Sequence, residues 1–257
     1  AYPTHEAFGA AGVGDVLRVL NKHPSVVSAA TFATTLFLNR CAKFVAVPLP
    51  SEAQFAPAYA ANVADADGDG HEDVFLSQNF FSLRMEWPRL DGGRGLWLRG
   101  NGKGQLFPMP GQESGIAVYG EQRGAAVGDF NEDGRIDLAI TQNGAATRLY
   151  ENVGAQPGLR VRLQGPPGNP LGFGAVLRLQ YGQRLGPARE VHGGSGYWSQ
   201  DSPVQILGGP EPPTRIHVLW PGGKSVVAPV PQGSREIVVS LDGLVRSERS
   251  GVPAERR

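Results

Sequence analysis

Short apolar runs separated by polar turns make up most of this 257-residue chain. The runs at 36–38, 44–47 and 74–76 are rich in branched and aromatic residues and are too short for ordinary helices, so they predict buried strands. A rough helical stripe from Val13 to Leu20 predicts one short helix near residues 11–21, which ends before Pro24. The pattern therefore predicts a mainly β protein.

Several of these runs recur at a spacing of about 60 residues. Leucine–aromatic segments begin at Leu36, Leu96 and Leu149, and the pair Gln78-Asn79 returns as Gln142-Asn143. Short strands repeated at this period are typical of propeller blades, which bury their faces against one another. Residues 34–153 contain the end of one blade, one full blade and most of another. We expect a partial β-propeller of about two to three blades, and favour a C-terminal piece of a larger propeller over an open stack of sheets.

Two acidic loops occupy matched positions in this repeat, one at 65–73 and one at 129–137. In each, oxygen-bearing side chains stand at positions 1, 3, 5 and 9, glycine at position 6 permits a sharp turn, and residue 7 can add its carbonyl. Calcium takes about six to eight such oxygens. The predicted Ca²⁺ ligands are Asp65, Asp67, Asp69, His71 and Asp73 in the first loop, and Asp129, Asn131, Asp133, Arg135 and Asp137 in the second, with His71 and Arg135 acting through their carbonyls.

An EF-hand opens in the same way but needs a glutamate at position 12. Leu76 and Ile140 stand there instead, within apolar runs that predict strands. The loops are therefore expected to join strands rather than helices. A pair of acidic hairpin turns without metal is the alternative interpretation.

From residue 158 the repeat stops and a different β pattern begins. Residues 159–163 alternate strictly, and further short runs follow at 175–179, 203–207, 216–220 and 237–239. About seven strands in some 85 residues predict a small β-sandwich-like domain over 158–241. Residues 1–33 form an N-terminal segment with the short helix, and the charged residues 242–257 predict a disordered tail.

Composition narrows the function classes. The formal net charge is zero, which argues against nucleic acid as a partner. The sequence contains no run of about 18 apolar residues, so no membrane span is predicted. Cys41 is the single cysteine, so no intrachain disulfide is expected, and the first residues show no signal-peptide pattern.

A catalytic serine is not favoured by the sequence. Ser195 lies in a glycine cluster, but a nucleophile elbow needs glycine where Tyr197 stands, and no helical pattern follows. The segments 80–95 and 108–123 are expected to be loops, whose aromatic and arginine side chains either form a partner surface or fill the blade faces.

The two Asp-rich loops and their strands resemble the FG-GAP/VCBS repeats of integrin-type propellers. Three later blocks, at 168–175, 189–200 and 218–223, are similar to the ASPIC/UnbV domain. This pairing resembles the cartilage acidic protein family and its bacterial relatives. The resemblance implies a calcium-binding adhesion-like protein that is secreted, at the cell surface or periplasmic, with no established catalytic residues. It also implies a weaker second site, because Asn131 replaces the usual Asp, and marks Cys41 as a departure from the usual Gly.

Three hypotheses follow. The first is a calcium-binding, non-catalytic module that meets an unidentified protein or glycan. The second is a carbohydrate-active lyase or hydrolase, which perturbed carboxylates, or His192 and His217, converging on one pocket would favour. The third is a structural cap, which an apolar contact of Trp198 or Trp220 with a blade would favour and a free hinge near Pro157 would oppose.

Overall fold

A computed structural model describes residues 2–20, 27–81 and 84–248 of the chain. The chain divides into two units, Ala1–Ala33 and Thr34–Arg257. Among the described residues the longest helix has seven residues, far short of the length that spans a bilayer.

The first unit contains two short helices, α1 (His5–Gly9) and α2 (Val13–Val19). The Thr4 side chain caps α1 by accepting a hydrogen bond from the Ala7 amide. The sequence predicted one helix near 11–21, and the prediction missed α1. The expected stop at Pro24 lies outside the described residues.

Three small antiparallel sheets follow, each with its strands in chain order. The first is the hairpin of β1 (Thr35–Arg40) and β2 (Lys43–Pro48). The second contains β3 (Ala58–Ala64), β4 (Asp73–Gln78), β5 (Leu96–Gly100) and β6 (Leu106–Pro108). The third contains β7 (Glu121–Gly128), β8 (Asp137–Asn143) and β9 (Ala145–Tyr150). A 3₁₀ turn, η1 (Ser51–Gln54), precedes β3, and the short α3 (Gly111–Ser114) precedes β7.

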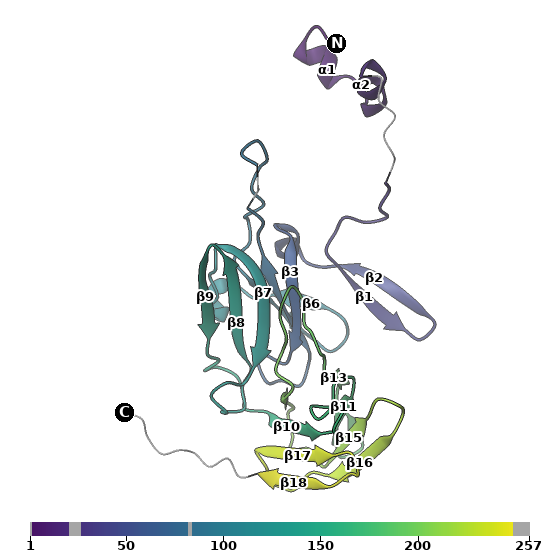
Figure 1. Ribbon diagram of the computed structural model, residues 1–257, viewed down its shortest axis with the longest axis vertical. Coiled ribbons are helices and arrows are strands. Elements are labelled where there is room, and N and C mark those ends of the chain that lie inside the picture. Colours follow the sequence, from purple (N-terminus) through teal and green to yellow (C-terminus); the bar gives the residue numbers. More distant parts are fainter. Residues whose placement is uncertain (1, 21–26, 82–83, 249–257) are drawn as a thin grey trace. The chain divides into compact units, whose positions relative to one another are not determined.

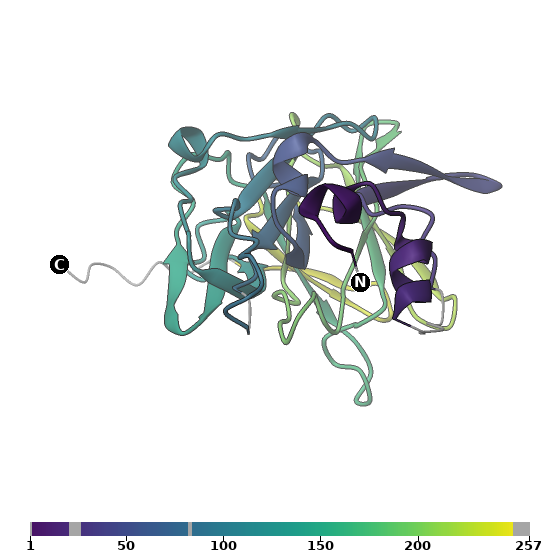
Figure 2. The same ribbon diagram turned by 90° about the horizontal axis from the view of Figure 1, so that it is seen from above.

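The second and third sheets lie side by side and pack through their faces (Figures 1 and 2). Phe75 and Trp97, whose ring centroids are 5.3 Å apart, meet Ile140 from the third sheet in one buried cluster. Small residues on β3, Ala60 and Ala64, let the sheets approach closely. These are propeller-like blades, as the 60-residue spacing predicted.

The C-terminal strands build a two-sheet sandwich. One sheet has the order β14-β10-β17-β18, in which β10 and β17 are parallel, and the other is built on β12-β11-β15-β16, with β13 also paired to β11. The strands are β10 (Leu159–Gln164), β11 (Val176–Tyr181), β12 (Arg184–Leu185), β13 (Arg189–Glu190), β14 (Gln205–Leu207), β15 (Arg215–Leu219), β16 (Ser225–Pro229), β17 (Glu236–Ser240) and β18 (Val245–Glu248). Alternate residues such as Val161, Leu177, Ile216 and Ile237 are fully buried between the sheets.

The predicted mainly β fold, with a partial propeller and a sandwich-like domain, is confirmed. Two details differ. Residues 245–248, expected in a disordered tail, form β18 against β17 because Val245 packs against the sandwich core. Residues 121–123, expected in a loop, begin β7, and the remainder of the predicted tail, 249–257, lies outside the described residues.

Candidate metal centre

The first acidic loop joins β3 to β4, and backbone amides hold its two end carboxylates. Asp65 accepts hydrogen bonds from the amides of Gly68 and Gly70, both at 2.9 Å. Asp73 accepts from the amides of Ala66, at 2.9 Å, and Gly100, at 2.8 Å. The glycines at 68 and 70 adopt φ values of 78° and 87°, a conformation that side-chain-bearing residues rarely adopt. The loop is therefore fixed by its own backbone before any ligand is considered.

Three carboxylates of this loop converge. One oxygen from each of Asp65, Asp67 and Asp73 lies within 4.8 Å of the others, and Asp65 and Asp73 are buried. Asp69 is exposed and instead accepts the His71 amide at 2.8 Å. The donor set is oxygen only, which fits a hard cation such as calcium.

The electrostatics of the loop also favour a cation. Burial, aided by the charges of Asp69 and Glu72, raises the pKa of Asp65 to about 6, although the Gly70 amide and Arg189 oppose the increase. Burial likewise raises the pKa of Asp73 to about 6, with Asp67 and Asp65 adding to the increase against the Gly100 and Ala66 amides. Buried carboxylates with raised pKa values gain from a neighbouring positive charge.

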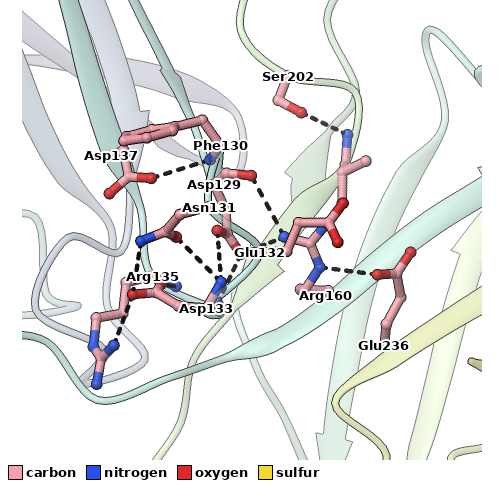
Figure 3. A network of polar contacts seen from close by, with 12 residues as sticks. Asp129, Phe130, Asn131, Glu132, Asp133, Arg135, Asp137, Arg160, Ser202 and Glu236 are labelled. Carbon is pink, nitrogen blue, oxygen red and sulfur yellow. Dashed lines mark hydrogen bonds and ion pairs between the residues drawn. The ribbon is translucent and has the colours of Figure 1, made fainter. Parts of the chain in front are cut away.

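The second loop joins β7 to β8 on the same backbone scaffold (Figure 3). Asp129 accepts the Gly134 amide at 2.7 Å, and Asp137 accepts the Phe130 amide at 3.0 Å. Asp133 is paired with the Arg135 guanidinium at 2.8 Å, as Asp67 of the first loop is with Arg99. Among the described residues only the first loop brings three carboxylates together, because position 3 of the second loop is Asn131.

The C-terminal domain contacts both loops, which the sequence did not predict. Arg189 of β13 pairs with Glu72 in the first loop, and Arg160 of β10 pairs with Asp129 in the second. The connecting segment is also bonded to the loops. The Gln156 amide donates to the Asp67 carbonyl at 3.3 Å, and the Gly158 amide donates to the Gly134 carbonyl at 2.8 Å. A free hinge near Pro157 is therefore ruled out in this structure.

A segment of the C-terminal domain, residues 195–202, runs beside the first strands of both blades. The Tyr197 amide donates to the Tyr59 carbonyl on β3 at 3.3 Å, and the Ser202 amide donates to the Val127 carbonyl on β7 at 2.9 Å. Ile206, just beyond it, is buried in the blade cluster. The apolar contact expected from tryptophan is absent, because Trp220 lies in the sandwich core and Trp198 is 93% exposed.

A cavity of about 610 Å³ lies between β3 and residues 188–206. His192 lines it, but His217 does not and instead contacts Gln180 at 2.7 Å. Two charged groups of the lining are already paired, Arg189 with Glu72 and Asp201 with the Asn62 amide at 2.8 Å. The two histidines therefore do not converge on one pocket.

Aromatic side chains gather at the end of the blades that lies away from the acidic loops. Tyr59, at the start of β3, meets Tyr197 edge to face at 6.0 Å, and Arg123 stacks on Tyr59 at 4.1 Å and approaches Phe80 at 5.9 Å. Trp198 is the most exposed of this group, which we call the aromatic end: Tyr59, Phe80, Arg123, Tyr197 and Trp198.

Comparison with known families gives a match, which lies in the C-terminal half of the chain. The family model described as ASPIC and UnbV matches residues 165–242, which contain all three sequence blocks that indicated this domain. The match covers the greater part of the sandwich. A search of curated proteins found no match to the chain.

Proposed function

We propose, from an ASPIC and UnbV domain docked on propeller-like blades, that this chain is a calcium-stabilised, non-catalytic module that presents a rigid surface to a protein or glycan. The main support for this proposal is the convergence of the Asp65, Asp67 and Asp73 carboxylates. These carboxylates, with Asp69 and the His71 carbonyl, would hold the ion. Bound calcium would neutralise the buried carboxylates and cross-link the turn.

The position of this turn explains how an ion would matter for binding. The linker bonds to Asp67 through Gln156, and Arg189 of the C-terminal domain bonds to Glu72 in the same loop. Stiffening the loop would therefore stiffen the junction between blades and sandwich. Extracellular modules bind calcium at about 10⁻⁴–10⁻³ M, which suits a protein that is secreted, surface-exposed or periplasmic.

The aromatic end is the surface that we assign to the partner. Exposed tryptophan, tyrosine and arginine side chains contribute most of the energy in many interfaces. The paired charges around the 610 Å³ cavity and the separated histidines favour binding over catalysis as the role of the chain.

Thermal unfolding tests the calcium site. With a Kd of about 1 mM, 10 mM CaCl₂ should stabilise the native state by about 1.4 kcal/mol, because only that state forms the cage. The expected rise in Tm is about 3–5 °C for a chain of this size. Asp67→Ala should lose this rise, while Asp91→Ala, which removes an exposed aspartate outside the loops, should keep it. Identical melting curves in calcium and in chelator would reject the proposal.

A further inference from the structure

The guanidinium group of Arg160 is buried against the second acidic loop. Its Nη1 bonds to an Asp129 carboxylate oxygen, its Nε bonds to Glu236 at 2.9 Å, and its Nη2 lies 3.5 Å from Glu132 (Figure 3). The side chains of Arg160 and Asp129 are 4% and 1% exposed. The ion pair is thus shielded from water and from competing salt.

This guanidinium keeps its charge. Arginine is not deprotonated in proteins, and Arg160 is bonded to the carboxylates of both Glu236 and Asp129. Asp129 is position 1 of the loop, the residue that opens the calcium motif. A divalent ion bound there would share a carboxylate with a fixed positive charge and would be repelled by it.

The first loop differs at the equivalent position. Among the described residues, only backbone amides donate hydrogen bonds to Asp65, and Arg189 forms its ion pair with Glu72. Each loop also has a carboxylate paired with a less buried arginine at 2.8 Å, Asp67 with Arg99 and Asp133 with Arg135. The difference between the loops is therefore the buried pair of Arg160 with Asp129 at position 1.

We infer that the second loop is not a calcium site and that Arg160 supplies its positive charge from the C-terminal domain. The inference rests on the proposed function only for the calcium site of the first loop. Calcium would then stabilise one blade turn, and domain docking would stabilise the other. The sequence predicted two calcium sites, whereas this inference predicts one bound ion per chain.

Calorimetric titration with CaCl₂ tests this assignment. The wild-type chain should bind one ion, Asp67→Ala should bind none, and Asp133→Ala should still bind one. Two ions in the wild-type chain, with one lost in Asp133→Ala, would overturn the inference and leave the proposed function standing. This comparison needs no change at Arg160.

Arg160→Gln adds a gain-of-binding test, because it removes the competing charge and keeps a polar side chain beside Glu236. Where this variant folds, it should bind one more ion than the wild-type chain, and an unchanged stoichiometry would overturn the inference. If the wild-type chain bound no calcium, the proposed function would fail, yet one ion gained by Arg160→Gln would still support the role of Arg160. If that variant does not fold, the Asp133→Ala comparison decides.

Discussion

Cys41 occupies a backbone conformation that suits glycine. It stands in the turn between β1 and β2 with a φ of 57°, where the Cβ atom is strained against the following carbonyl. The side chain is exposed and its sulfur forms no disulfide. The family resemblance marked this position as one where glycine is usual, and the turn geometry supplies the physical reason.

Cys41→Gly should therefore stabilise the chain. Relief of left-handed strain is worth about 1–2 kcal/mol, and the added freedom of the unfolded chain costs about 0.4–1 kcal/mol, leaving a gain of roughly 0.5–1 kcal/mol. Urea unfolding measures the difference. Ala42→Gly in the same turn has no positive φ to relieve and should destabilise, so equal losses in both variants would contradict the argument.

The segment 195–202 shows how one element ties two blades together. Asp201 accepts hydrogen bonds from the Asn62 side chain of β3 and from the Val127 amide of β7, both at 2.8 Å. Burial raises the pKa of Asp201, although these two hydrogen bonds lower it in part. The protonated carboxyl is thus favoured in the folded state more than in the unfolded chain.

The raised pKa of Asp201 sets the sign of a pH dependence. The contribution of Asp201 to stability is fully present below the unfolded pKa of about 4 and is lost as pH rises through the raised folded pKa. A tenfold difference in proton affinity between the folded and unfolded chains corresponds to about 1.4 kcal/mol of stability. In urea titrations from pH 4 to 7, wild-type stability should therefore fall relative to that of Asp201→Asn, and parallel profiles for the two chains would refute the prediction.

Glu121 should give the opposite pH dependence of stability, because its pKa is lowered rather than raised. Burial alone would raise its pKa, but hydrogen bonds from Asn143, the Phe81 amide and Arg123 lower it below its ordinary value. The contribution of Glu121 is present above its unfolded pKa and is lost as pH falls through the lowered folded pKa. In urea titrations from about pH 2 to 5, the stability of the wild-type chain should rise with pH relative to that of Glu121→Gln, and parallel profiles would contradict this prediction.

At the scale of the molecule, the two ends of the blade strands β3 and β7 differ in their contacts. The acidic loops follow the ends of β3 and β7, where Arg189 and Arg160 dock the sandwich. The aromatic end lies at the starts of the same strands. One end thus holds the two domains together, and at the other end Trp198 is exposed, as the proposed partner surface requires.

Removing that tryptophan should weaken partner binding. Trp198→Ala should lower the affinity by about tenfold or more, as truncation of an interface tryptophan does, without a change in Tm because the side chain is exposed. The affinity is measured by binding to immobilised glycan and matrix-protein arrays in a buffer that contains CaCl₂. Phe130→Ala, an exposed aromatic residue in the second acidic loop, is the matched control, and equal binding by all three chains would remove the aromatic end from consideration.

Much of the fold could be predicted from local patterns. The spacing of the runs beginning at Leu96 and Leu149 predicted β5 and β9, and the alternation at 159–163 predicted β10. The prediction failed where local signals are weak. Val245–Glu248 carries charged residues and forms a strand only because β17 offers it an edge.

The candidate site divides in the same way. The acidic residues and the glycine of each loop lie within nine consecutive residues, so the acidic turns between strands followed from the sequence alone. Whether the first carboxylate of a turn meets an arginine depends on residues far along the chain, such as Arg160, which meets Asp129 at a separation of 31 residues and Glu236 at 76. Contacts at such distances leave no periodic trace in a single sequence, and only the packing of the sandwich against the blades brings them together.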